Sequence, residues 1–221
     1  MLSSEARLQL LTPPNGSVNV VIDTDTFNEV DDQFALVHAL LSPERLNVKA
    51  IYAAPFHNKR SSGPGDGMEK SYQEILEILE LVHVEHEPPV YRGAAAFLSS
   101  ETTAVESDAA HDLMRRGQAV TEPLYVIALG ALTNIASALL LEPSLSERLV
   151  VVWLGGHAFH WPHNQEFNLK QERAATRVLL ASGVPLVLIP CMGVTSHLQT
   201  TVPEIERYVE PRGEVGQFLA E

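Results

Sequence analysis

Short apolar, β-branched runs alternate along the chain with segments in which apolar side chains recur at helical spacing. The apolar runs predict strands over 18–22, 48–54, 124–129, 150–154 and 184–189. The helical spacing predicts helices over 32–41, 68–82, 108–116, 134–141 and 171–182. Because uninterrupted apolar strands separated by helices are typical of buried parallel sheets, the pattern predicts an α/β fold, a mostly parallel open sheet with helices on both faces.

The turn-forming segment 12–16 precedes the first predicted strand, and the Gly-, Pro- and Ser-rich segment 57–67 predicts a loop. No repeat or linker divides the sequence, so we expect residues 1–221 to form one domain. In open parallel sheets, ligands bind beyond the carboxyl ends of the strands. Candidate functional residues should therefore directly follow the predicted strands.

Composition narrows the possible partners of the protein. The 221 residues include 15 Lys and Arg against 28 Asp and Glu, a formal net charge of −13. A surface this acidic repels phosphate and anionic lipid, which argues against nucleic acid and membrane surfaces as partners. The single cysteine, Cys191, excludes an intrachain disulfide. With neither a secretory pattern nor a membrane-length apolar stretch in the sequence, we expect a cytoplasmic protein.

An acidic cluster follows the first predicted strand. Its five carboxylates within ten residues are those of Asp23, Asp25, Glu29, Asp31 and Asp32. Without a counter-ion, such crowding would raise their pKa values and strain the fold. A hard divalent cation with oxygen ligands, Ca²⁺ or Mg²⁺, would relieve the repulsion, whereas a solvated acidic loop is the alternative interpretation.

Two enzyme families resemble the chain at this cluster. The Asp-Thr-Asp-Thr segment 23–26 resembles the opening motif of haloacid-dehalogenase-type phosphatases, in which Asp23 would be the nucleophile. The same segment followed by the pair Asp31 and Asp32 resembles the opening of nucleoside hydrolases. This short motif by itself leaves both possibilities open.

Later segments favour the second family. The strand at 124–129 runs into Gly-Ala-Leu-Thr-Asn at 130–134, which strongly resembles a nucleoside hydrolase segment. The Gly-Gly turn at 155–156 and Glu-Phe-Asn at 166–168 resemble the next segments of that family, in the same order. The chain is therefore identified as a member of the nucleoside hydrolase family, the inosine-uridine-preferring N-ribohydrolases, whose fold is Rossmann-like.

The resemblance implies an activity and a site. The enzyme would hydrolyse the N-glycosidic bond of ribonucleosides to ribose and free base, in nucleoside salvage, with a water that bound Ca²⁺ activates. Asp25 would be metal ligand and general base, with Asp32 and the main-chain carbonyl of Leu129 as further ligands. The substrate contacts would come from Asp31, Asn58, His160, Glu166 and Asn168. Members of this family are commonly homo-oligomers, dimers or tetramers, which we expect here too.

The chain departs from the family pattern in two places. Five residues, 26–30, separate Asp25 from the acidic pair where the family usually has three, so this loop must bulge and Asn28 or Glu29 could reach the metal or the sugar. The family also has a late His-Asp pair, whereas the only such pair here, at 111–112, precedes the Leu-Thr-Asn segment. We therefore expect a C-terminally incomplete form with weak metal binding and activity.

Other chemistry-bearing residues suggest less. His157, His160 and His163 could bind zinc, but Pro162 breaks their register and no acidic partner has a fixed spacing, so a pocket wall is the favoured interpretation. Cys191 lacks a partner that would activate it as a nucleophile. A third hypothesis, besides hydrolase and phosphatase, is a non-catalytic calcium- or ribose-binding protein.

Overall fold

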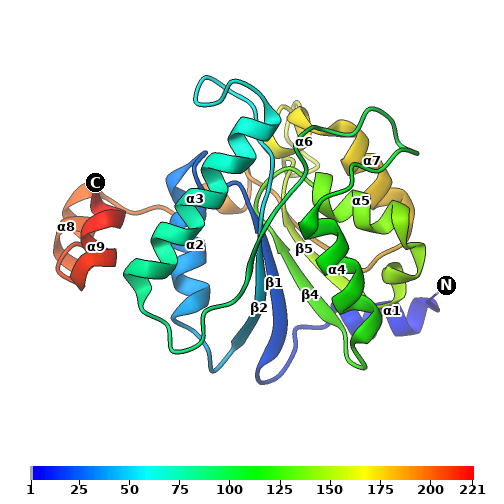
Figure 1. Ribbon diagram of the computed structural model, residues 1–221, viewed down its shortest axis with the longest axis horizontal. Coiled ribbons are helices and arrows are strands. Elements are labelled where there is room, and N and C mark those ends of the chain that lie inside the picture. The colour runs from blue at the N-terminus through cyan, green and yellow to red at the C-terminus, as the bar shows by residue number, and fades with distance from the viewer. Residues whose placement is uncertain (1) are drawn as a thin grey trace.

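The computed structural model describes residues 2–221 and contains one six-stranded sheet between helical layers (Figure 1). The strands are β1 (Val18–Thr24), β2 (Leu46–Ala53), β3 (Val90–Arg92), β4 (Leu124–Ala128), β5 (Leu149–Leu154) and β6 (Leu186–Ile189). Their order in space is β3-β2-β1-β4-β5-β6, and every neighbouring pair is parallel. The predicted parallel α/β sheet is confirmed.

Helices cover the sheet from both sides. The helices of the described residues are α1 (Ser4–Leu11), α2 (Val30–Leu40), α3 (Pro64–Val82), α4 (Asp108–Ala119), α5 (Thr133–Leu141), α6 (Phe167–Gln171), α7 (Arg173–Ser182), α8 (Val202–Tyr208) and α9 (Gly213–Ala220), with the short 3₁₀ segments η1 (Pro143–Glu147) and η2 (Thr195–His197). Helices α2 and α3 lie on one side, and α4, α5 and α7 on the other (Figure 1). Because successive strand side chains point to opposite faces, Val21 packs in one core and Ile22 in the other.

The strand order reverses at the centre of the sheet. The chain runs outward from β1 to β2 and β3, then returns to pair β4 with the other edge of β1. In doubly wound folds such a reversal opens a crevice at the carboxyl ends of the two central strands. The acidic cluster begins in the last residues of β1 and continues beyond it, and the Gly-Ala-Leu-Thr-Asn segment follows β4, so the fold brings both to this crevice.

Several elements differ from the prediction. Residues 4–11 form α1, which buries no residue, so no apolar periodicity marks it in the sequence. Strand β3 has three residues, too few to show a pattern. Helix α3 begins at Pro64 rather than at 68. Its first turn packs closely against the main chain at Phe56, which is possible because residue 67 is glycine; a Cβ on Gly67 would lie only 2.1 Å from the main-chain oxygen of Phe56.

The helix predicted over 171–182 is interrupted at Glu172. The carboxylate of Glu172 accepts hydrogen bonds from the main-chain N–H of Leu98 (2.8 Å), the Thr133 hydroxyl (2.9 Å) and the main-chain N–H of Ala175 (3.3 Å). It therefore begins α7 and ties that helix to the start of α5. Within residues 2–221, none of the helices has the length and apolar character needed to cross a membrane.

Candidate functional site

A cavity of about 290 Å³ lies at the carboxyl ends of the central strands. Six of the eight site residues that the sequence predicts line it, namely Asp25, Asp31, Asp32, Leu129, Glu166 and Asn168. They come from the loop after β1, the first turn of α2, the end of β4 and the segment after β5. The topology thus brings together residues that are up to 143 positions apart in the sequence.

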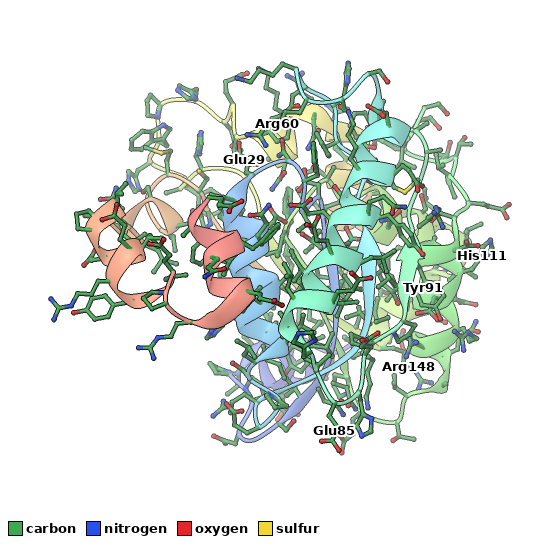
Figure 2. The ribbon with its side chains drawn as sticks, turned by 60° about the vertical axis from the view of Figure 1, so that its left-hand side comes forward. Glu29, Arg60, Glu85, Tyr91, His111 and Arg148 are labelled. Carbon is green, nitrogen blue, oxygen red and sulfur yellow. The ribbon has the colours of Figure 1, made fainter. Side chains whose placement is uncertain are left out.

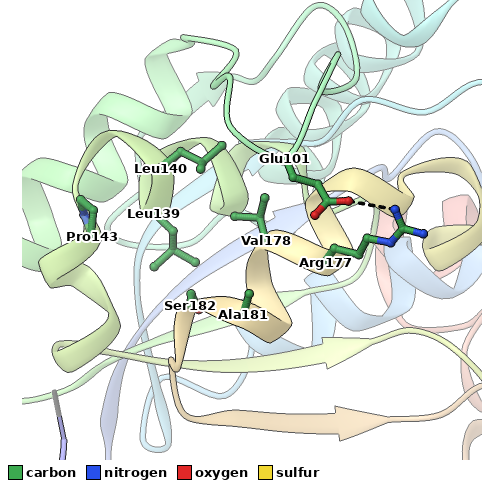
Figure 3. A pocket seen from close by; sticks show the side chains of 8 residues that line it. All are labelled: Glu101, Leu139, Leu140, Pro143, Arg177, Val178, Ala181 and Ser182. Carbon is green, nitrogen blue, oxygen red and sulfur yellow. Dashed lines mark hydrogen bonds and ion pairs between the residues drawn. The ribbon is translucent and has the colours of Figure 1, made fainter.

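A second pocket, of about 240 Å³, is lined by residues of α5 and α7 (Figure 3). Apolar leucine, proline, valine and alanine side chains form most of its wall, and the ion pair between Arg177 Nη1 and Glu101 Oε1 (2.8 Å) lies at its edge. None of the predicted site residues lines it. The chemistry-bearing residues of the chain therefore gather at the strand ends rather than in this pocket.

The alternation of side chains along β1 separates the first two polar residues of the acidic segment. Asp23 points toward α5, where its Oδ2 accepts a hydrogen bond from Asn134 Nδ2 at 2.8 Å. Thr24 points the other way and donates its hydroxyl to Asp32 Oδ1. Asp23 is completely buried and is not among the residues that line the cavity. Asn134 and Thr24, which sequence reasoning did not single out as site residues, therefore fix the orientation of two acids.

Asp25 lies at the floor of the cavity. Only 1% of it is exposed, and its Oδ2 has no hydrogen-bond partner among the described residues. Gly130 leaves the space that this carboxylate occupies, because a Cβ on Gly130 would lie 2.7 Å from Asp25 Oδ1. Burial, reinforced by the nearby charge of Asp32, raises the pKa of Asp25 well above its usual range.

The other two buried acids are perturbed in the same direction. Burial raises the pKa of Asp32 to about 8, against the hydrogen bond from Thr24, which lowers it. Burial raises the pKa of Asp23 to about 7, against the hydrogen bond from Asn134. Among the described residues that line the cavity there is no Lys or Arg, so no basic side chain there compensates these carboxylates.

This donor set fits a hard cation. Carboxylate oxygens of Asp25 and Asp32, with the main-chain oxygen of Leu129, are the ligand type that Ca²⁺ and Mg²⁺ prefer. The unpartnered, buried Asp25 Oδ2 is the observation that calls for a positive charge here. Within residues 2–221 no three His, Cys, Asp or Glu side chains converge on one point, so the main-chain oxygen is part of the fit.

Hydrogen bonds hold Glu166 and Asn168 firmly at the cavity wall. Glu166 Oε1 accepts from the main-chain N–H of Asn168 (2.7 Å), and Oε2 accepts from those of Leu169 (2.8 Å) and Gly156 (2.8 Å). Asn168 Nδ2 donates to the main-chain oxygens of Leu129 (2.6 Å) and Leu154 (3.1 Å). The carbonyl predicted as a metal ligand is therefore in contact with a predicted sugar-binding amide.

The histidine loop after β5 places its members differently from one another. His157 lines the cavity, whereas His160 is exposed and is not among the lining residues. His157 Nδ1 accepts a hydrogen bond from the main-chain N–H of Met192 (3.3 Å), which leaves Nε2 as the protonated nitrogen of the neutral ring. The rings of His157 and His163 are 5.6 Å apart, and no acidic residue joins them in a metal-binding group in the described chain.

The lengthened loop 26–30 changes the rim of the cavity. Asn28 and Glu29 both line it, whereas the predicted sugar ligand Asn58 does not. Glu29 and Arg60 lie at the end of the molecule where α2 begins (Figure 2). Burial and the charge of Asp31 raise the pKa of Glu29, and Arg60 opposes this. The unusual loop length was the only sequence signal for these rim residues.

The acidic, oxygen-lined cavity thus lies at the switch point of a doubly wound parallel sheet, where α/β proteins bind their ligands. The family model for inosine-uridine preferring nucleoside hydrolase matches residues 20–221. The chain belongs to this family, a class of hydrolases that act on N-glycosidic bonds, as the sequence motifs predict.

A curated sequence relative agrees with this assignment, and solved structures share the fold. The pyrimidine-specific ribonucleoside hydrolase RihA of Salmonella paratyphi B is 28% identical over 227 residues, which cover 91% of this chain and 69% of RihA. The purine-preferring ribonucleoside hydrolase from Gardnerella vaginalis has the same fold, with a TM-score of 0.74, 24% identity, and coverage of 91% of this chain and 69% of that one. The type III effector XopQ, solved with adenosine diphosphate ribose, shares the fold at a TM-score of 0.71 and 14% identity, over 99% of this chain and 70% of XopQ.

Proposed function

We propose that the protein hydrolyses the N-glycosidic bond of ribonucleosides, with Ca²⁺ as its metal and Asp25 as its general base. The observation that carries this proposal is the unpartnered Oδ2 of Asp25, buried beside Asp32 in the cavity of a nucleoside hydrolase family member. A carboxylate that is buried without a partner costs stability, so its retention at the strand ends supports a functional role.

Asp25, Asp32 and the main-chain oxygen of Leu129 would hold the cation. When bound, Ca²⁺ supplies the positive charge that lowers the pKa of a water molecule and orients it toward the sugar. Leu129 is already placed for this, because its main-chain N–H donates to the main-chain oxygen of Asp23 at 2.8 Å and so fixes the end of β4 beside β1. The site therefore rests on the two central strands.

The residues of the chain itself would bind the substrate and move one proton. Asp25 Oδ2, which accepts no hydrogen bond from the protein, would take the proton of the attacking water. Asp31, at the first turn of α2, would accept hydrogen bonds from ribose hydroxyls, and Asn168 and Glu166 would bind the sugar from the opposite wall. Their rigid hydrogen bonds favour a preorganised sugar site.

The buried state of Asp23 argues against the phosphatase alternative. A nucleophilic carboxylate must reach its substrate, but Asp23 is completely buried, is hydrogen-bonded to Asn134 and does not line the cavity. A cytoplasmic location, a role in nucleoside salvage and a homo-oligomeric state stay predictions of the sequence.

Incubation of the purified protein with inosine or uridine in the presence of Ca²⁺ tests the proposal. We expect equal amounts of free base and ribose, loss of both with a chelator, and recovery when Ca²⁺ is restored. Phosphate release from p-nitrophenyl phosphate in a parallel reaction would instead support the phosphatase. Calorimetric nucleoside binding without any base release would support the non-catalytic alternative.

A further inference from the structure

The lengthened loop 26–30 places an amide in the cavity. Asn28 is 3% exposed and lines the cavity together with Asp25 and Asp32. Its main-chain N–H donates to the main-chain oxygen of Asp25 at 2.7 Å, which fixes the turn that carries it. Its Oδ1 accepts a hydrogen bond from Asn58 Nδ2 at 2.6 Å, whereas no described residue accepts a hydrogen bond from Asn28 Nδ2.

A main-chain donor outside the cavity sets the orientation of both amides. The main-chain N–H of Arg60 donates to Asn58 Oδ1 at 2.8 Å. Because a main-chain N–H can only donate, the oxygen of Asn58 must face it, and Nδ2 of Asn58 must face Asn28. Asn28 then has to turn its own oxygen toward Asn58, which leaves Nδ2 as the free end of its amide. The cavity therefore presents a hydrogen-bond donor at this point.

We propose that Asn28 is a substrate-binding residue that donates its Nδ2 to a hydroxyl oxygen of the ribose, and that Asn58 is the positioning residue that orients it. The proposal rests on the nucleoside hydrolase function proposed above. Asn28 does not serve as a metal ligand, because the end of its amide that faces the cavity carries hydrogens rather than a lone pair.

The neighbouring residues explain why a donor is needed here. Asp25, Asp31 and Asp32 present carboxylates, which as ions only accept hydrogen bonds. A ribose hydroxyl that donates its hydrogen to one of them still has an oxygen that can accept a hydrogen bond. In the cavity this oxygen no longer contacts bulk water, so it needs a donor from the protein. The Nδ2 of Asn168, on the opposite wall, already donates to two main-chain oxygens. Asn28 Nδ2 is free to satisfy such a hydroxyl.

The same geometry accounts for the position of Asn58. The sequence predicts Asn58 as a sugar ligand, but it lies outside the cavity and contacts Asn28, which lies between it and the site. Its amide thus acts on the substrate through the amide of Asn28. The turn in the loop 26–30, closed by the main-chain hydrogen bond from Asn28 to Asp25, carries Asn28 to this position.

The test is the variant Asn28→Asp, which keeps the oxygen that faces Asn58 and replaces the donor with an acceptor. We expect KM for uridine to rise roughly tenfold or more, with a smaller change in kcat, as loss of a hydrogen bond to a substrate hydroxyl predicts. The matched control is Asn19→Asp, because Asn19 Oδ1 also accepts from an asparagine amide, that of Asn47 at 2.9 Å, at the opposite end of the strands. KM of the control should equal that of the wild type.

Deoxynucleosides identify the hydroxyl. Removing one of the 2′-, 3′- or 5′-hydroxyls of uridine should weaken binding to the wild type but much less to Asn28→Asp. Asn58→Asp should reproduce the effect, because its second oxygen cannot donate and forces the Asn28 amide to turn over. Wild-type KM in Asn28→Asp, or equal losses for every deoxy analogue in both proteins, would overturn the proposal.

Calorimetric binding of uridine separates this inference from the proposed catalysis. If the wild type releases no base, the proposed function fails, and the inference is then decided by uridine affinity alone. Weaker binding by Asn28→Asp and Asn58→Asp but not by Asn19→Asp would support the donor role. Equal affinity in all four proteins, or no binding of uridine by the wild type, would overturn it.

Discussion

Buried carboxylates occur at two places in the molecule, in helix α4 and beyond the carboxyl end of β1, and their surroundings differ. Asp112 in α4 is 3% exposed, and its Oδ2 accepts hydrogen bonds from the Tyr52 hydroxyl (2.8 Å) and Arg116 Nε (2.5 Å). Its Oδ1 accepts a third, from Arg115. This acid is buried with its counter-charges and with both oxygens satisfied.

Asp25 and Asp32 are equally buried but receive no such compensation. Among the described residues, Asp25 Oδ2 has no hydrogen-bond partner, Asp32 accepts a hydrogen bond from the hydroxyl of Thr24, and neither Lys nor Arg lines their cavity. Two arginines compensate the buried charge of Asp112, whereas burial of two carboxylates together without a cation leaves charge uncompensated and costs stability. This difference supports a structural role for Asp112 and the cation-binding role proposed for the acidic cluster.

The largest expected effect on activity is that of the variant Asp25→Asn. We expect kcat/KM for nucleosides to fall by about 10³-fold, because the general base and a metal ligand are lost together. The midpoint of thermal unfolding should not fall, since the change removes a buried carboxylate that has no partner. Steady-state kinetics and calorimetry check both results; activity near that of the wild type would contradict the role of Asp25.

Gly130→Ala should lower kcat/KM by about 10²-fold although it removes no polar atom of the site. The added Cβ would lie 2.7 Å from Asp25 Oδ1, so the carboxylate has to move, and displacement of a catalytic group by about 1 Å has an effect of this size. Gly63→Ala is the matched control, because nothing lies within 4 Å of its added Cβ. Equal activity of the two variants would show that Asp25 is not held where the structure places it.

Asp112→Ala should have the opposite effects to Asp25→Asn: it should lower stability and leave activity unchanged. Loss of this acid leaves Arg116 and the buried Tyr52 hydroxyl without their partner, so the free energy of unfolding should fall by about 3 kcal/mol. Denaturant titration measures this change. The kcat per folded molecule should stay unchanged, because Asp112 is not part of the cavity. A stable variant with lower kcat would contradict a structural role.

The raised pKa values of Asp32 and Asp23 should make the stability of the protein depend on pH. The pKa of Asp32 is raised from 3.8 to about 8 and that of Asp23 to about 7, so the folded protein keeps protons that the unfolded chain releases. Their contribution is fully present below about pH 4, the pKa range of unfolded Asp, and is lost as the pH rises toward 8. In calcium-free protein the unfolding midpoint should therefore fall by several degrees over this range. Asp32→Asn should flatten the curve, and an unchanged slope would contradict the assignment.

The smallest effect is expected in the histidine loop. His157 lines the cavity and His160 is exposed outside it, so His157→Gln should lower kcat/KM several-fold whereas His160→Gln should leave it within about twofold of the wild type. Parallel kinetics on the two variants decide between them. A larger loss of kcat/KM in His160→Gln than in His157→Gln would support the sugar contact that the sequence predicts for His160.

The sequence predicts the sheet and the floor of the site for a shared physical reason. Buried parallel strands must be apolar on both faces, and a carboxylate directly after such a strand lies where the carboxyl ends of the strands meet. This argument places the segments 23–32 and 129–134 at the strand ends, whereas the roles expected for Asp25 and Leu129 come from the family resemblance. Helix α1 buries nothing and β3 has three residues, so neither leaves a periodic signal.

The walls and rim of the site depend on loop geometry that no periodicity encodes. Whether Asn28 or Asn58 faces the cavity depends on how the lengthened loop turns, and this is fixed by the main-chain hydrogen bond to Asp25. His157 rather than His160 enters the cavity because the loop after β5 turns back toward Met192. Such choices require coordinates.

Calcium titration of the calcium-free protein, followed by calorimetry, tests the central claim most directly. We expect one Ca²⁺ to bind per chain and to raise the midpoint of thermal unfolding more at pH 8 than at pH 5. Asp25→Asn and Asp32→Asn should abolish this binding, whereas Asp112→Asn should retain it. Equal calcium affinity in the wild type and Asp25→Asn, or no binding to the wild type, would contradict the claim that these buried carboxylates form a cation site.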